Sequence, residues 1–342
     1  MCSGRSPRSS LDIDDVQQRL HLPEPTLRWL RTLHGGRDGS PRTALPDDDE
    51  ADRLLTRLGV ASIDRATTLR ARPDPAAHPE LWWIMGRLCD DLRSTMGTPP
   101  AGGGWPAFPQ HTGSAGRHLL VWACLAVLPD VRRYHARHDV PDDISWASLA
   151  ALGTEMASAR RLTGAGGLDA TWGMPRVFRG VTYRLGRLAF DRQRPRPEPP
   201  DHAVLRAGHS GLNTHVPADG GPLDPAACDT SFAMAVRFFP HRFPERVGAF
   251  GCHSWLMDEQ LANYLPETSN IVRFQRRFRT FVDREQADWA PLENVFHRRY
   301  ESDEVPPELL DELPRTTTLQ RAVVTHLRRG GHWYNQTGWI PV

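Results

Sequence analysis

Residues 214–223 read Thr-His-Val-Pro-Ala-Asp-Gly-Gly-Pro-Leu, and no other stretch says more about the architecture of this chain. They end an apolar run, 204–216, that is predicted to be a strand with a bulge or irregularity indicated by Gly208 and Gly211. They precede Asp224, a helix N-cap, and Pro225, which suits the first position of a helix. A strand therefore passes through a glycine turn into a helix, and open α/β sheets place ligand-binding groups at such strand ends.

Two more polar clusters lie at the edges of apolar runs. Cys-His-Ser-Trp-Leu, residues 252–256, closes a predicted strand over 247–254, and Ser-Asn-Ile-Val-Arg-Phe-Gln, residues 269–275, leads into a predicted strand over 271–281. The other elements expected in this half are extended segments across 177–190, a helix over 225–239, a short helix over 258–265, a hairpin strand at 292–299, a helix over 318–329 and a closing strand at 332–342. The second half is therefore predicted to mix helices and strands.

The first half shows helical periodicity only. Its predicted helices cover 13–20, 26–33, 47–58, 79–96, 114–128 and 142–161, with Pro129 marking a kink or an end. The pattern changes near residue 160. We therefore expect an α+β protein with an all-helical domain over 1–160 and a mixed α/β domain over 161–342.

The charge balance limits the classes of partner. The 342 residues carry a net charge of +1, so a broad nucleic-acid surface is not expected. Every one of the 42 basic residues counted as Lys+Arg is an arginine. This composition excludes Schiff-base chemistry and the lysine of phosphate-binding loops in nucleotide hydrolases.

Cysteine usage and hydropathy point to a cytoplasmic protein without a membrane segment. The five cysteines are odd in number and form no Cys-x-x-Cys pair, so neither a zinc knuckle nor a disulfide framework is predicted. The first ten residues lack the apolar core of a signal peptide. The longest apolar run, 119–128, is about half of the ~20 residues needed to span a bilayer, and we expect a buried helix there.

The order of elements in the second half resembles the core of GNAT-type N-acyltransferases. Several strings also resemble a bacterial family of acyltransferase-domain proteins, which have a helical N-acyltransferase N-terminal domain and a GNAT-like C-terminal domain. The strings are His215-Val-Pro-Ala-Asp-Gly-Gly-Pro-Leu, Ser231-Phe232, Phe238-Phe239, Cys252-His-Ser-Trp-Leu and Ser269-Asn-Ile-Val-Arg-Phe. The resemblance implies transfer of an acyl group from acyl-CoA, or from an acyl-carrier protein thioester, to a small-molecule amine.

One string of the GNAT pattern is missing. Gln/Arg-x-x-Gly-x-Gly/Ala, which holds the CoA pyrophosphate in that family, is replaced by residues 217–222. The resemblance assigns CoA binding to the main chain of this segment and its neighbour, namely Val216, Ala218, Gly220 and Gly221. Asp219 and Asp224 add negative charge and two prolines remove amide donors, so a simple turn followed by a helix cap stays open as the alternative.

The resemblance also implies catalytic and substrate-binding roles. His215 would be the base that deprotonates the amine, His253 and Ser254 would lie on the neighbouring strand beside the thioester, and Tyr264 would protonate the thiolate. Substrate binding is assigned to Asn270 and Arg273. Each residue also has a purely structural interpretation, as a cap, a turn residue or a packing side chain.

Strand geometry argues against two other sites. Cys252 adjoins His253, but adjacent strand residues point to opposite faces, so Cys252 is predicted to be a core thiol. His209, His215 and His253 lack metal-ligand spacing, so no metal is predicted. Two alternatives to the acyltransferase remain: a non-catalytic GNAT-like binding or scaffold protein, and a cysteine-dependent hydrolase.

Overall fold

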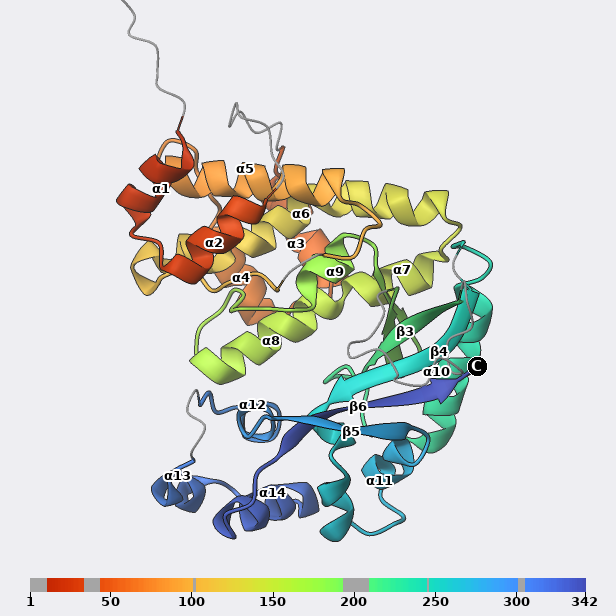
Figure 1. Cartoon of the computed structure of the whole chain (residues 1–342). Coiled ribbons are helices and arrows are strands. Elements are labelled where there is room, and N and C mark those ends of the chain that lie inside the picture. Colours follow the sequence, from red (N-terminus) through yellow and green to blue (C-terminus); the bar gives the residue numbers. More distant parts are fainter. Residues whose placement is uncertain (1–10, 34–43, 101–102, 193–208, 245, 301–304) are drawn as a thin grey trace, which may run out of the picture. The chain divides into compact units, whose positions relative to one another are not determined.

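The computed structural model describes residues 11–33, 44–100, 103–192, 209–244, 246–300 and 305–342 (Figure 1). The chain forms two compact units. The first comprises Met1–Arg137, Leu149–Arg160 and Gly164–Gly180, and the second comprises His138–Ser148, Arg161–Thr163 and Val181–Val342. The predicted domain boundary at residue 160 stays a prediction.

The first unit is helical. Its helices are α1 (Ile13–Leu20), α2 (Glu24–Thr32), α3 (Asp48–Arg57), α4 (Ser62–Arg70), α5 (Pro79–Ser94), α6 (Gly113–Arg137), α8 (Ala151–Thr163) and α9 (Met174–Phe178), with a 3₁₀ turn η1 (Gln110–Thr112) before α6. The predicted apolar stripe of α5 is buried, with Ile84, Met85, Leu88 and Leu92 at 0% exposure. Burial of that stripe against other apolar side chains is what stabilises a helix of this kind.

Helix α6 confirms the predicted buried helix and extends it. Residues 119–128 are all buried, and the helix runs on through Pro129 to Arg137 instead of ending there. The single helix predicted over 142–161 is two helices, α7 (Asp142–Leu149) and α8, and α4 was not predicted. None of the helices formed by the described residues is long and apolar enough to cross a membrane.

The second unit contains a six-stranded sheet in the order β1-β2-β3-β4-β6-β5. Its strands are β1 (Thr182–Leu185), β2 (Leu188–Asp191), β3 (His209–His215), β4 (Arg246–Ser254), β5 (Arg279–Gln286) and β6 (Tyr334–Pro341). The β3 and β4 strands are parallel, and every other neighbouring pair is antiparallel. Of the two glycines that indicated an irregularity, Gly211 lies at a register shift between Ser210 and Gly211, which confirms that part of the prediction. Gly208 and the rest of 204–208 lie outside the described residues.

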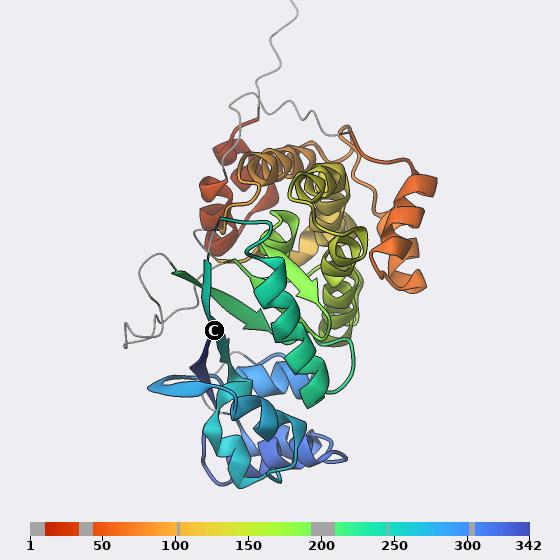
Figure 2. The same ribbon diagram turned by 90° about the vertical axis from the view of Figure 1, so that its right-hand side faces the viewer.

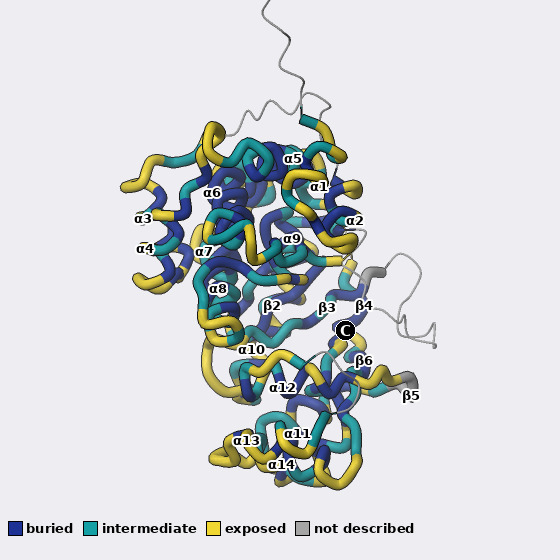
Figure 3. The backbone as a smooth tube through the Cα atoms, turned by 90° about the vertical axis from the view of Figure 1, so that its left-hand side faces the viewer, coloured by how far each residue is buried: buried dark blue, intermediate teal, exposed yellow. Residues whose placement is uncertain are grey.

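The helix α10 (Pro225–Phe238) connects the parallel pair and covers one face of the sheet (Figure 2). The ring of Phe232 on this helix lies 4.9 Å from that of Phe250 on β4 and 5.7 Å from that of Phe190 on β2. Many residues of the central strands are buried, among them Leu212 on β3 and Phe250 on β4 (Figure 3). The order strand–glycine loop–helix–strand that was predicted from the sequence is therefore confirmed.

Two predicted strands are wrong. Residues 270–275 form the helix α11 (Asn270–Gln275), and β5 begins only at Arg279. The side chain of Ser269 caps α11 by accepting a hydrogen bond from the amide of Val272 at 3.2 Å, which the alternation of apolar residues had concealed. Residues 292–299, predicted to pair with that strand, lie largely in the helix α12 (Trp289–Phe296), and β6 is the neighbour of β5 instead.

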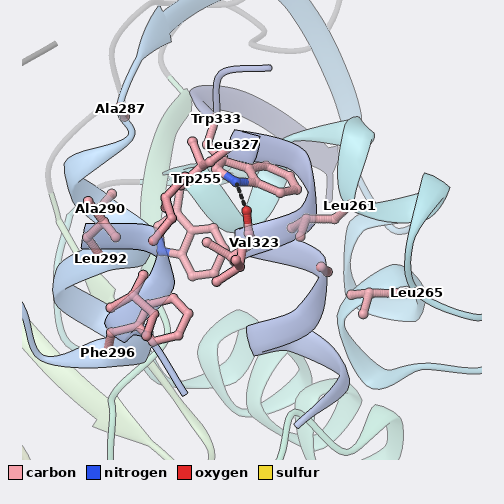
Figure 4. Packing of buried hydrophobic residues seen from close by; sticks show 14 of the residues in the cluster. Trp255, Leu261, Leu265, Ala287, Ala290, Leu292, Phe296, Val323, Leu327 and Trp333 are labelled. Atoms are coloured by element: carbon pink, nitrogen blue, oxygen red, sulfur yellow. Dashed lines mark hydrogen bonds between the residues drawn. The ribbon is translucent and has the colours of Figure 1, made fainter. Parts of the chain in front are cut away.

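A second apolar cluster explains why α12 is a helix. Its buried side chains, among them Leu292 and Phe296, pack with residues of α14 (Thr318–Arg328) around Trp333, whose indole nitrogen donates to the carbonyl of Val323 at 3.4 Å (Figure 4). The 3₁₀ turns η2 (Trp255–Met257) and η3 (Glu259–Asn263), together with α13 (Pro307–Glu312), add further side chains to this cluster. Packing against neighbours distant in the sequence, not local propensity, decides the structure of 289–296.

Candidate active site

The carboxyl ends of β3 and β4 lie at one edge of the sheet because the two strands are parallel. Their mutual pairing ends at Asn213 and Gly251. Beyond that point, His215 pairs with β2 and His253 pairs with β6. Within the described residues, the ends of β3 and β4 therefore no longer pair with each other. An extended ligand can form hydrogen bonds with the main-chain groups left open between them.

His215 is held by a buried carboxylate. Its Nε2 lies 2.7 Å from Oδ2 of Asp191, which is 0% exposed, whereas the histidine side chain is 43% exposed. The hydroxyl of Thr182 donates to the other carboxylate oxygen. Because a carboxylate accepts, Nε2–H is the donor, and this tautomer puts the basic lone pair of the imidazole on Nδ1. The arrangement is that of a general base oriented by an acid.

His253 lies on the same face of the sheet as His215. His215 lies two residues after Asn213 and His253 two residues after Gly251, which are the last paired residues of β3 and β4. Because side chains alternate along a strand, both histidines point to the same face. Nδ1 of His253 is 2.8 Å from the hydroxyl of Thr337 on β6. Burial lowers the pKa of His253, and the carboxylate of Glu285 opposes the shift, so the imidazole is neutral at neutral pH.

Ser254 and Cys252 lie on the opposite face. The Ser254 hydroxyl accepts a hydrogen bond from the amide of Leu256 at 3.1 Å and so begins η2. Cys252 is buried, which confirms the predicted core position, and burial raises its pKa to about 12. A thiol with this pKa is almost fully protonated at neutral pH, so the structure argues against a cysteine nucleophile.

The segment 217–222 is held by two arginines from the β1–β2 hairpin. Arg187 donates to three of its carbonyls, those of Pro217 at 3.0 Å, Gly221 at 2.8 Å and Pro222 at 3.1 Å. Arg184 donates to the carboxylate of Asp219 at 2.9 Å. This ion pair offsets the negative charge of Asp219, which was one of the arguments against anion binding by this segment.

The amides of this segment face no acceptor among the described residues. Over the described part of the chain, the N–H groups of Ala218, Asp219, Gly220 and Gly221 have no hydrogen-bond partner. Gly220 and Gly221 have φ of 90° and 77°, a conformation that glycine adopts without strain. The helix α10 follows at once, and Asp224 caps it through the amide of Ala227 at 3.0 Å. Free amides next to a helix N-terminus form a site suited to a phosphate group.

The remaining predicted site residues lie directly after η3 and on α11. The Tyr264 hydroxyl is 3.0 Å from Nδ1 of His326 on α14, and its ring packs against the Trp333 cluster. Asn270 is the first residue of α11, and the exposed Arg273 uses its carbonyl to accept from the Arg277 side chain. The structure therefore brings His215, His253 and the glycine segment to one sheet edge and places these three elsewhere in the unit.

Sequence reasoning missed the residues that orient the site. Asp191, Arg184 and Thr337 come from other strands and Arg187 from the β1–β2 turn, and none of the four was singled out. A carboxylate at the end of an apolar run, such as Asp191 after Leu-Ala-Phe, is the one local signal that could have been noticed. The side chain of His209 lies outside the described residues, and those that are described contain no group of three or more His, Cys, Asp or Glu placed to hold a metal ion.

Comparison with known proteins identifies both halves of the chain. Residues 49–180 match the model of the N-acyltransferase N-terminal domain, and residues 182–340 match that of the GNAT-like C-terminal domain. No curated protein matches the chain.

Solved structures of acyltransferases are similar over nearly the whole length. A crystal structure of an acyltransferase in complex with decanoyl-CoA is 36% identical, with 97% of this chain and 100% of that chain covered and a TM-score of 0.83. One in complex with decanoyl-CoA and teicoplanin is 35% identical, with 97% and 99% covered and a TM-score of 0.83. A mutant in complex with octanoyl-CoA is 35% identical, with 97% and 100% covered and a TM-score of 0.84.

Proposed function

This chain belongs to the family of two-domain N-acyltransferases with a GNAT-like C-terminal domain, and on that premise we propose that it acylates an amine of a small molecule. It is an acyltransferase that uses acyl-CoA as donor. The observation that carries the proposal is the Asp191–His215 pair at the strand edge where β3 and β4 cease to pair.

The donor would lie along this edge. In the proposal the amides of Ala218, Gly220 and Gly221 bind the CoA pyrophosphate, supported by the positive end of the α10 dipole. Val216, which directly follows β3, and the unpaired edge of β4 would hydrogen-bond the pantetheine arm as a short added strand. Arg184 neutralises Asp219, so the segment presents its amides without an opposing charge.

The chemistry assigned to His215 is general base catalysis. Its Nδ1 takes a proton from the attacking amine, while Asp191 holds Nε2–H and stabilises the imidazolium. The amine nitrogen forms a bond to the thioester carbonyl carbon, the carbon–sulfur bond breaks, and the proton finally resides on the departing CoA thiol. Amide and free CoA are the products.

His253 and Ser254 are assigned to donor positioning on the two faces of β4. The neutral imidazole of His253 can donate toward the carbonyl oxygen on the His215 side, and the Ser254 hydroxyl toward the pantetheine. Tyr264 is occupied by His326, so we assign it no chemical step. Asn270 and Arg273 stay candidates for acceptor binding, and use of an acyl-carrier protein as donor stays a prediction.

The acceptor is proposed to be a small molecule because a relative was crystallised with teicoplanin in addition to decanoyl-CoA. Octanoyl- and decanoyl-CoA in the solved structures favour a medium-length acyl chain for this protein as well.

Mass spectrometry of the reaction products tests the proposal. The protein is incubated with decanoyl-CoA and a panel of small-molecule amines that includes teicoplanin, and release of free CoA is followed. We expect an acceptor whose mass rises by one decanoyl group, and a fall in kcat of roughly 10²- to 10⁴-fold in His215→Ala. The matched control is His241→Ala, because His241 is exposed and bonds only a carbonyl of its own helix end. CoA binding without transfer to any amine would favour the non-catalytic alternative.

A further inference from the structure

The β1–β2 hairpin turn, Gly186-Arg187, carries a side chain that the chemistry above does not use. The turn has two residues, since Leu185 pairs with Leu188, and Gly186 adopts φ of 69° as such turns require. Its main chain is fixed to α10, because the buried hydroxyl of Ser231 accepts from the amides of Arg187 at 2.9 Å and Leu188 at 3.3 Å. Arg187 therefore projects from a rigid point.

From that point its guanidinium reaches the segment 217–222. Three of its N–H groups are spent on carbonyls at both ends of the segment: Pro217 on one side, and Gly221 and Pro222 on the other. A planar fork with several fixed donors can join several acceptors at once, whereas a lysine ammonium acts as a point charge. The contact spans 30 to 35 residues of sequence and closes the segment into a loop.

The direction of these three bonds determines where the amides point. In a trans peptide the carbonyl and the following N–H point in opposite directions. Because Arg187 draws the carbonyls of Pro217 and Pro222 toward itself, the amides of Ala218 and Leu223 are turned away from it. Between them, Gly220 and Gly221 supply two more amides that lack a partner among the described residues.

We propose that Arg187 is the positioning residue of the donor site, which holds the segment 217–222 so that its amides face the CoA pyrophosphate. Arg187 itself contacts carbonyls, not phosphate, and acts through the loop. Its effect is therefore confined to donors that carry the pyrophosphate. This inference rests on the proposed function, in which the segment binds CoA. The inference also gives the Ser231-Phe232 string a role. Ser231 bonds the main chain of the hairpin turn that carries Arg187, and Phe232 packs on the sheet.

Two donors separate a positioning role from a general structural one. Steady-state kinetics are measured with decanoyl-CoA and with S-decanoyl-pantetheine, which has the same thioester but no pyrophosphate. For Arg187→Met we expect KM for decanoyl-CoA to rise roughly 10- to 100-fold, because amide–phosphate hydrogen bonds are charge-assisted. We expect kcat/KM for S-decanoyl-pantetheine to stay within about 2-fold. The KM of Arg187→Lys for decanoyl-CoA should lie nearer to that of Arg187→Met than to that of the native protein.

Arg242→Met is the matched control. Arg242 is also half-buried in this unit and donates to two carbonyls, those of Asp139 and Phe238, away from the loop. Arg242→Met should leave the kinetic constants for both donors unchanged. Equal losses with both donors in Arg187→Met, or no loss with either, would overturn the inference. Failure of the native protein to transfer from either donor would instead overturn the proposed function.

Discussion

Asp191 and His215 differ in one respect that fixes their roles, since the carboxylate is buried and the imidazole reaches solvent. A buried carboxylate needs a partner, and here Thr182 and His215 supply it. A histidine exposed on its other side can meet a substrate. The pair therefore has the layout in which one group orients and the other exchanges protons.

Asp191→Asn tests this division of labour. The amide keeps the size of the side chain but cannot stabilise an imidazolium, so we expect kcat to fall by about 10- to 100-fold, with KM for acyl-CoA little changed. The pH profile of kcat, measured for both proteins, shows how the loss of the carboxylate changes the protonation of His215. Thr182→Val removes only the donor to the other carboxylate oxygen and should reduce kcat much less. Full activity in Asp191→Asn would refute the orienting role.

At the scale of elements, caps and turns decided the structure more than apolar alternation did. Residues 271–275 alternate as a strand does, yet Ser269 caps the amide of Val272 and the segment is helical. Conversely, Asp224 and Pro225 were predicted as the start of a helix, and α10 begins there. Where a cap and a periodicity disagree over a short stretch, the cap is the better guide.

The glycine segment gives a prediction with a close internal control. Gly221 and Gly330 both have open space for a Cβ and nearly the same φ, 77° and 75°. Alanine at either position should lower the free energy of unfolding by about 1–2 kcal/mol through left-handed strain. Only Gly221→Ala should also raise KM for acyl-CoA, because only that residue lies in the proposed donor loop. Chemical denaturation and steady-state kinetics on both variants measure the two effects, and an unchanged KM in Gly221→Ala would argue against the loop.

At the scale of the whole molecule, histidines whose pKa values are lowered in the folded chain make stability depend on pH. Burial lowers the pKa of His118, His253 and His297 below the ordinary value of 6.5. The unfolded chain therefore takes up protons near pH 6.5 that the folded chain does not. Stability is fully present above pH 6.5 and is lost progressively as the pH falls through the folded pKa values.

His118 is expected to contribute most, because it is 1% exposed and its Nε2 has no partner among the described residues. The carbonyl of Ser114 and the charge of Asp64 oppose the shift, and Arg117 and Arg160 support it. Urea midpoints at pH 7.5 and 5.5 should differ less in His118→Gln than in the native protein. An identical difference in both proteins would show that another group causes the pH dependence.

Local sequence was enough for much of the fold and for the region of the site. Helical periodicity in the first half, the strand–glycine turn–helix order after residue 204, and His215 beside the glycine segment all follow from contiguous residues. Family membership follows from strings in the right order and is confirmed by the comparisons. These features depend on caps, turns and periodicities that a few neighbouring residues encode by themselves.

Contacts between distant residues were decided by the tertiary structure alone. Asp191 meets His215 across 24 residues, and Arg187 meets the glycine segment across 30 to 35. Both depend on the register of β1, β2 and β3, and a slip by one residue would turn each side chain to the other face. Register is set by packing of the whole sheet against α10. That is why the strand ends could be predicted from the sequence. The contact of Asp191 with His215 and that of Arg187 with the segment 217–222 could not be predicted, because both depend on the register of the sheet.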